Sequence, residues 1–247
     1  MANTASGVES ADTQLSSSVG DYLKTIWQLA HDGPVSTGDI AKELGVTAPS
    51  VTGMLGRMSG LGLIHYQPYR GAELTEEGRR EALRLIRRHR LLETFMINEL
   101  GFGWEEVHGE AELMEHVVSD DFTERLAAHL GQPEFDPHGD PIPRADGSLP
   151  SAPDTPLAEL RPGERFIVHR VLSQDSELLG YLEGVGIEPG RQLTLRSKEP
   201  GGALLHLEFA DARGAPGKGG VGATARSLAL SRALAEVVLG KLVDRQS

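Results

Sequence analysis

The chain has 247 residues, of which 39% are hydrophobic and 24% charged, and its formal net charge is −12. This length suffices for one large domain or for two or three small ones, and the composition is that of an ordinary soluble protein. The absence of cysteine excludes a disulfide scaffold, and no apolar run approaches the roughly 18 residues of a membrane span. We therefore expect a cytoplasmic protein, with a disordered tail at residues 1–18 because that segment is small and polar and lacks the basic start and apolar core of a signal peptide.

Residues 19–75 carry the pattern of a winged helix-turn-helix domain. An amphipathic helix is predicted at 19–31, with Asp21 in its first turn, where a carboxylate can simply complement the helix dipole. Two short helices follow, one capped at Ser36 or Thr37 and ended by Gly45, the other running from a cap at Thr47 to Ser59 or Gly60. The segments LIHYQ, PYRG and AELT then read as strand, turn and strand, which is the pattern of a wing.

A helix-turn-helix of this kind places short hydroxyls and cations where they can reach phosphates and base edges in the major groove. A three-helix core with polar outer faces is the competing interpretation, and the acidic net charge argues against a nucleic-acid partner. Arginine nevertheless clusters in RREALRLIRRHR (79–90). The candidate DNA-contacting residues are Ser36, Thr37, Thr47, Pro49, Ser50, Thr52, Arg57 and Arg70.

A long helix is predicted from Thr75 to Leu100, followed by a break at Gly101–Gly103 and by one or two helices to Leu130. Histidine and glutamate recur on these helices at spacings of three and four, so that each set projects from one helical face. The residues concerned are His89, Glu93, His108, Glu112, Glu115 and His116. His129 falls outside this phase, and we expect it on the surface.

An isolated histidine–glutamate pair at this spacing is usually a solvated surface pair. Apolar residues interleave with these pairs, however, so parts of both helical faces should be buried, and buried charges need partners or a metal. The apolar residues are Leu91, Leu92, Phe95, Met96, Leu113, Met114 and Val117. Because every donor is nitrogen or oxygen, manganese or ferrous iron is favoured over a thiolate zinc site.

The composition changes after Leu130. Residues 131–156 hold seven of the 14 prolines, which excludes helix and central strand and indicates a linker. From Leu157 onward, short strands between turn signals and a helix at 176–184 predict a small β-barrel. The glycine-rich stretch at 214–222 lacks the pattern of a phosphate-binding loop, and we interpret it as a hairpin loop.

The order of these parts resembles the diphtheria-toxin-repressor family of iron- and manganese-dependent transcriptional regulators. The resemblance is carried by GDYLKTIW, VTAPSVTGML, YRGAELTEEGR, RRHRLLETF, VHGEAELMEHVVSD, HGDPIPR and GVGIEPG. It implies a mainly α fold with a small β-barrel: a winged helix-turn-helix domain (19–75), a helical dimerisation and metal-binding domain (76–130), the linker, and an SH3-like barrel (157–247) of the kind seen in ferrous-iron transport accessory proteins. It also implies a homodimer that binds palindromic operators when loaded with one or two metal ions per subunit.

The resemblance further implies two ligand sets. The primary set is Asp21, Glu112, Glu115 and His116, and the ancillary set is His89, Glu93 and His108, completed from the barrel by Asp175 and Glu177. Iron-type members place methionine and cysteine where Asp21 and Glu112 stand, so the primary set resembles that of manganese-type members. Manganese-type members carry a glutamate where Lys24 stands and often lack a histidine at position 108. The ancillary set is therefore a hybrid of the two types.

Two other functions stay open at this point. Glutamate and histidine around two divalent ions also build metallohydrolases, although no substrate loop accompanies this cluster and we expect no catalytic residues. A helix-turn-helix regulator that senses an organic ligand is the other alternative. The proline-rich segment further predicts that the barrel is a tethered module, whose removal after about Gly131 leaves a folded dimer.

Overall fold

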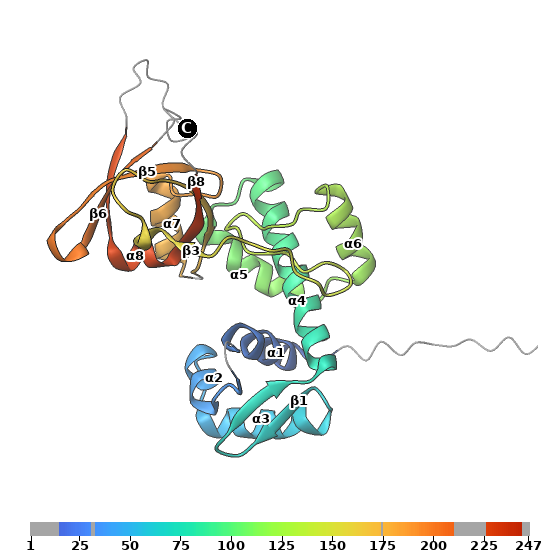
Figure 1. Cartoon of the computed structure of the whole chain (residues 1–247). Helices are drawn as coiled ribbons and strands as arrows, with labels where there is room; N and C mark the ends of the chain where they lie inside the picture. Colours follow the sequence, from blue (N-terminus) through green and yellow to red (C-terminus); the bar gives the residue numbers. More distant parts are fainter. Residues whose placement is uncertain (1–14, 31–32, 174, 210–225, 244–247) are drawn as a thin grey trace, which may run out of the picture. The chain divides into compact units, whose positions relative to one another are not determined.

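The computed structural model describes residues 15–30, 33–173, 175–209 and 226–243 (Figure 1). The chain divides into two compact units, residues 1–85 and residues 86–247, and each is described by itself. The predicted glycine-rich loop and residues 1–14 of the predicted N-terminal tail lie outside the described residues. Ser17 and Ser18 already belong to a helix, so the predicted extent of the tail, to residue 18, is wrong. Within the described residues, no helix is long and apolar enough to cross a membrane.

The N-terminal unit is the predicted winged helix. Its elements are α1 (Ser17–Leu29), α2 (Thr37–Glu43), α3 (Ala48–Gly60), β1 (Ile64–Gln67), β2 (Gly71–Leu74) and the first turns of α4 (Glu76–Phe95). Apolar side chains from all three helices and from the wing share one core, in which Ile26, Ile40, Val51 and Leu55 are fully buried. This burial holds α2 and α3 in the helix-turn-helix arrangement.

Local hydrogen bonds explain where these helices begin. The Ser36 hydroxyl accepts a hydrogen bond from the backbone N–H of Asp39 at 3.0 Å, and the Thr47 hydroxyl accepts one from Ser50 at 3.5 Å. Gly45, with φ of 63°, makes the turn between the two helices, a conformation that favours glycine. Both predicted caps are confirmed.

In the C-terminal unit, α4 continues through a π-helical turn at Met96–Leu100 and breaks at Gly101, where φ is 75°. Two helices follow, α5 (Trp104–Glu115) and α6 (Asp120–His129), beside the C-terminal half of α4 (Figure 1). Leu91, Val107 and Leu126 are among the buried residues that join the three helices in one core. The predicted break is therefore confirmed, and His129 is exposed as expected.

Part of the predicted apolar burial is wrong for the single chain. Leu91, Leu92 and Met96 are buried, but Leu113 and Val117 are 74% and 75% exposed, and Met114 is 37% exposed. These last three residues, called the α5 apolar face below, lie at the end of α5 and just beyond it. Periodicity identified the face correctly, but the described residues leave most of Leu113 and Val117 uncovered.

The C-terminal barrel is an antiparallel sheet of strand order β3-β8-β4-β5-β6-β7 with short helices packed on it (Figure 1). The strands are β3 (Thr155–Pro156), β4 (Arg165–Val171), β5 (Gln192–Lys198), β6 (Leu204–Phe209), β7 (Ser227–Ser231) and β8 (Val238–Val243). The helical segments are η2 (Leu157–Glu159), α7 (Ser176–Val185), η3 (Pro200–Gly202) and α8 (Arg232–Val237). Alternate strand residues point into one apolar core, so the predicted small barrel with a helix at 176–184 is confirmed.

The proline-rich segment is packed rather than extended into solvent. Ile142 is 1% exposed and belongs to the helical core, and the Arg87 side chain donates a 2.9 Å hydrogen bond to the Pro143 carbonyl. The backbone N–H of Val171, in β4, donates to the His138 carbonyl at 2.8 Å. On the helical side, Trp104 of α5 is buried in the barrel's core. The barrel is thus fastened to the helices through the middle of this segment and through Trp104, which goes beyond a simple tether.

This packing predicts different outcomes for two truncations. A chain that ends at Leu130 loses Ile142, whereas one that ends at Pro150 keeps it, so the shorter chain should be less stable by at least about 2 kcal/mol, the transfer free energy of one buried isoleucine. Urea unfolding and size-exclusion chromatography would compare the two. Equal unfolding midpoints would restore the earlier expectation of a boundary near Gly131.

Candidate metal centre

Two helices bring His89, Glu93 and His108 together, and these three residues are called the histidine cluster below. His89 and Glu93 lie one turn apart on α4, and Glu93 Oε1 lies 3.0 Å from His89 Nε2 and 3.4 Å from His108 Nδ1 of α5. The two imidazoles approach each other at 3.1 Å, between His89 Nε2 and His108 Nδ1. Nitrogen and oxygen donors from two helices therefore converge on one point.

The cluster is buried because α4 and α5 pack through the apolar residues on either side of it. His89 is 7% exposed and Glu93 3% exposed. Burial by itself raises the pKa of Glu93, but the positive charge of His89 and hydrogen bonds from His108 and His89 outweigh it and hold that pKa well below its usual range. Hydrogen bonds to Glu112 and Glu93 raise the pKa of His108 to about 9 against the opposing effect of burial. The surroundings thus favour positive charge at this point.

The predicted primary residues extend from this cluster along α5. Glu115, 0% exposed, places Oε2 at 2.5 Å from His89 Nδ1, and its Oε1 lies 3.5 Å from His116 Nε2. Glu112 Oε1 lies 3.4 Å from His108 Nε2. Glu112, Glu115 and His116 are therefore continuous with the histidine cluster, while Asp21 belongs to the N-terminal unit.

The structure gives Asp21 a different local setting from the predicted one. Helix α1 begins at Ser17, so Asp21 stands beyond its first turn, which contains no acidic residue. The unsatisfied N–H groups of a helix lie in its first turn, and a carboxylate farther along gains little from them. The simple dipole-capping interpretation of Asp21 is therefore wrong.

Asp175 and Glu177 do not join the histidine cluster. Asp175 Oδ1 accepts hydrogen bonds from the backbone N–H groups of Glu177 and Leu178, at 3.0 and 3.2 Å, and so caps α7. Both acidic residues are exposed. Within the described ranges, neither belongs to a group of ligand-type atoms lying within 4.8 Å of one another. The expectation that the barrel completes this set therefore finds no support in the geometry.

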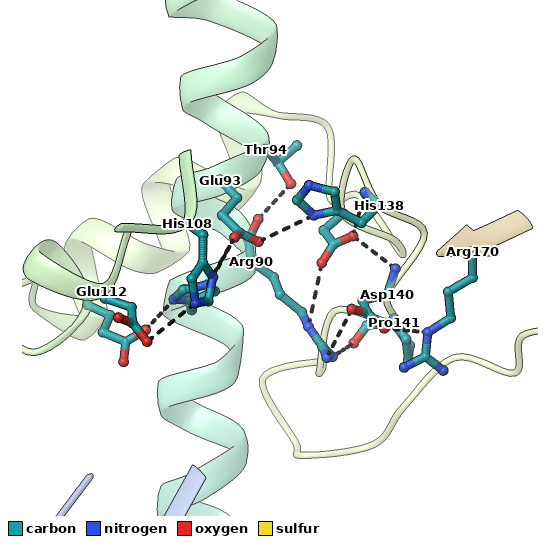
Figure 2. A network of polar contacts seen from close by, with 12 residues as sticks. Arg90, Glu93, Thr94, His108, Glu112, His138, Asp140, Pro141 and Arg170 are labelled. Atoms are coloured by element: carbon teal, nitrogen blue, oxygen red, sulfur yellow. Dashed lines mark hydrogen bonds and ion pairs between the residues drawn. The ribbon is translucent and has the colours of Figure 1, made fainter. Parts of the chain in front are cut away.

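The linker supplies two ligand-type residues instead, and sequence reasoning missed both of them. Asp136 and His138 lie beside Glu93, with one ligand-type atom of each of the three within 4.8 Å of the others. Figure 2 shows Glu93 between His108 on one side and His138 on the other. The available signal was HGDPIPR, which carried part of the family resemblance, but nothing in a proline-rich segment indicated that its histidine was buried.

The candidate DNA-contacting residues all belong to the N-terminal unit. Thr47, Pro49, Ser50, Thr52 and Arg57 are exposed on α3 and at its start. The wing tip exposes Arg70, and Ser36 is exposed at the start of α2 beside a half-buried Thr37.

Comparison with known proteins decides the family. Residues 75–144 match the family described as iron dependent repressor, metal binding and dimerisation domain, residues 14–72 match its N-terminal DNA binding domain, and residues 155–219 match the FeoA domain. The chain is 35% identical over 197 residues to the iron-dependent repressor IdeR of Mycobacterium tuberculosis, an alignment covering 74% of this chain and 86% of that protein. The chain belongs to the iron-dependent repressor family.

Two other similar proteins are also repressors by name, and one of them is named for manganese. The diphtheria toxin repressor of Corynebacterium glutamicum is 33% identical over 196 residues, covering 75% of this chain and 86% of that protein. A manganese-dependent transcriptional repressor solved in complex with manganese is 36% identical, with a TM-score of 0.77 over 90% of this chain and 98% of that chain. The match of the repressors' metal-binding domain runs to residue 144, so Asp136 and His138 fall inside it.

Proposed function

We propose that the protein is a manganese- or iron-dependent transcriptional repressor, in which metal binding promotes operator binding by a homodimer. The observation that carries this is the buried histidine cluster, because its donors converge from two helices and one of those helices, α4, starts at the end of the wing. Membership in the iron-dependent repressor family supports it, as do the exposed residues of α3 and Arg70.

The donor set fits a first-row divalent cation. His89 and His108 offer imidazole nitrogens and Glu93 offers a carboxylate, a combination that suits manganese and ferrous iron and contains no thiolate. A bound ion would supply the positive charge beside the Glu93 carboxylate that protonated His108 supplies without it. The second set, Glu112, Glu115 and His116, adjoins the first, and we propose Asp21 as its ligand from the N-terminal unit on the strength of the sequence match.

A homodimer is supported by the α5 apolar face. Leu113 and Val117 are three-quarters exposed in the single chain, and contiguous exposed apolar residues are typical of protein–protein contacts. A two-fold dimer would present two copies of α3, which suits an operator with two half-sites about one helical turn apart. The palindromic form of the operator is part of the proposal.

The direct test is DNA retention as a function of metal. A pool of random-sequence duplexes enriched on the protein with micromolar manganese or ferrous iron should yield fragments that are retained with either ion and released by a chelator. Arg57→Ala should weaken retention without changing metal binding, since Arg57 is exposed on α3 and is not one of the proposed ligands.

Three results would separate the proposal from its alternatives. Equal retention with and without metal would contradict regulation by metal. Retention that responds to an organic extract but not to metal would favour a ligand-sensing regulator. Metal-dependent cleavage of phosphoesters, without sequence-selective retention, would favour a metallohydrolase.

A further inference from the structure

The two oxygens of the Glu93 carboxylate face different partners. Oε1 lies within 3.4 Å of a nitrogen of both His89 and His108, inside the histidine cluster. Oε2 faces Nδ1 of His138, from the linker, at 4.0 Å (Figure 2). A separation of 4.0 Å is too long for a hydrogen bond, so the second oxygen meets an imidazole that it does not bond.

The residues around this second oxygen are deeply buried. Glu93 is 3% exposed, His138 5% and Asp136 6%. Among the described residues, Nε2 of His138 has no hydrogen-bond partner. Polar groups buried without partners cost free energy, and most buried imidazoles are bonded at one nitrogen or both. The His138 ring is thus held in the interior with Nδ1 turned toward Glu93 and with Nε2 unsatisfied by the described protein neighbours.

Arg90, rather than a cation, could neutralise Asp136, but its guanidinium contacts several acceptors at once. Its Nε lies 3.6 Å from Asp136 Oδ2 and its Nη2 3.8 Å from Asp140, while Nη1 donates to the Pro141 carbonyl at 2.5 Å. A strong arginine–carboxylate pair has two parallel contacts below 3 Å. Asp136 Oδ1 is held by backbone N–H groups of His138 and Asp140, each at 2.9 Å, and these fix the carboxylate beside Glu93.

We propose that Glu93, Asp136 and His138 form a further binding site for a first-row divalent cation, with Glu93 bridging it to the histidine cluster. The two oxygens of one carboxylate would then serve two neighbouring cations, as in other two-metal sites. The proposal rests on the proposed function, since it shares Glu93 with the histidine cluster. It adds two ligands, Asp136 and His138, that lie outside both sets expected from the sequence.

Such a site would join parts of the C-terminal unit that are far apart in sequence. Glu93 lies on α4, while Asp136 and His138 lie in the linker. The His138 ring packs edge to face on Trp104, with 4.8 Å between ring centroids, and Trp104 is buried in the barrel's core. Cation binding here would therefore brace the linker, and through it the barrel, against the metal-binding helices.

The test counts manganese ions bound per chain, by equilibrium dialysis of the full chain followed by metal analysis. His138→Gln and Asp136→Asn should each bind one ion fewer than the wild type, and Asp136→Asn keeps an oxygen for the two backbone N–H groups. His169→Gln is the matched control: its Nε2 is also buried and without a hydrogen-bond partner in the described part of the chain, its ring packs on Phe135 at 4.5 Å, and it belongs to no ligand group. It should bind as many ions as the wild type.

A second measurement, made on a chain that keeps all of the proposed ligands, covers the case in which the ligand variants fail to fold. In a Trp27→Phe background, Trp104 is the single tryptophan, and its fluorescence should be quenched as the last manganese ion binds. Unchanged stoichiometry in both folded variants, or a full titration without any change in Trp104 fluorescence, would overturn the inference. If His108→Gln lost ions but His138→Gln did not, the further site would be overturned and the proposed function would stand. If the wild type bound no manganese, the proposed function would be overturned as well.

Discussion

Replacing Asp21 by alanine should abolish metal-stimulated DNA binding while leaving the fold and the dimer intact. Asp21 is the one proposed ligand in the N-terminal unit, so its loss removes the means by which the ion can favour one arrangement of the DNA-binding half. Raising a 1% competent population to 99% requires a preference of about 5.5 kcal/mol, which an ion that no longer binds that half cannot supply. The fold should tolerate the change, because Asp21 lies beyond the first turn of α1 and does not cap it.

Replacing Asp21 by methionine sharpens the test. A thioether is a softer ligand than a carboxylate, so Asp21→Met should weaken the response to manganese more than the response to iron. The measurement is DNA affinity against free metal concentration for the wild type and both variants, with circular dichroism as the folding control.

Asp121→Ala is a matched control, because the Asp121 side chain is 78% exposed and pairs with Arg125 of the same helix, α6. It should behave as the wild type with both metals. If the curves of the wild type and both Asp21 variants coincided for both metals, Asp21 would not be a ligand and the proposed coupling would fail.

Replacing Gly78 by alanine should destabilise the N-terminal unit by about 3 kcal/mol, at the upper end of the usual cost of overpacking. A Cβ at this position would stand 1.9 Å from the carbonyl oxygen of Leu63, which also accepts a 3.0 Å hydrogen bond from the backbone of Thr75. The Thr75 hydroxyl in turn donates to the Gly62 carbonyl at 2.8 Å. The start of α4 is clamped to the chain before β1 and cannot retreat without breaking these bonds.

Gly56→Ala provides a control of opposite sign. Gly56 lies inside α3, and a Cβ there meets nothing within 4 Å, so alanine should stabilise the helix by about 0.5–1 kcal/mol. Urea unfolding of the two variants in the presence of chelator would separate them. Midpoints that moved in the same direction would show that the Leu63 contact does not govern the effect at Gly78.

Where local rules suffice, the sequence was a reliable guide. The caps at Ser36 and Thr47, the wing and the break at Gly101 all depend on residues within a few positions of one another. The spacing of His89 and Glu93 showed that they share a helical face for the same reason. That His108 of α5 joins them came from the family resemblance, because no local rule relates two different helices.

Packing between distant segments decided the rest. The α5 apolar face has the composition of a core, yet Leu113 and Val117 are exposed, because periodicity identifies a face but not what covers it. Asp175, predicted as a ligand, satisfies the start of its own helix instead.

By itself, the sequence determined the family, the three kinds of domain and the histidine and glutamate residues on α4 and α5, since these follow from motifs and from helical period. Only the tertiary structure brought Asp136 and His138 to Glu93. A proline-rich segment has no period from which burial can be predicted, and its path is fixed by contacts such as that of Ile142 with residues some fifty positions earlier in the chain. Asp136 and His138 are buried because the backbone near them is bound to α4, where Arg90 and Arg87 donate hydrogen bonds to the Pro141 and Pro143 carbonyls.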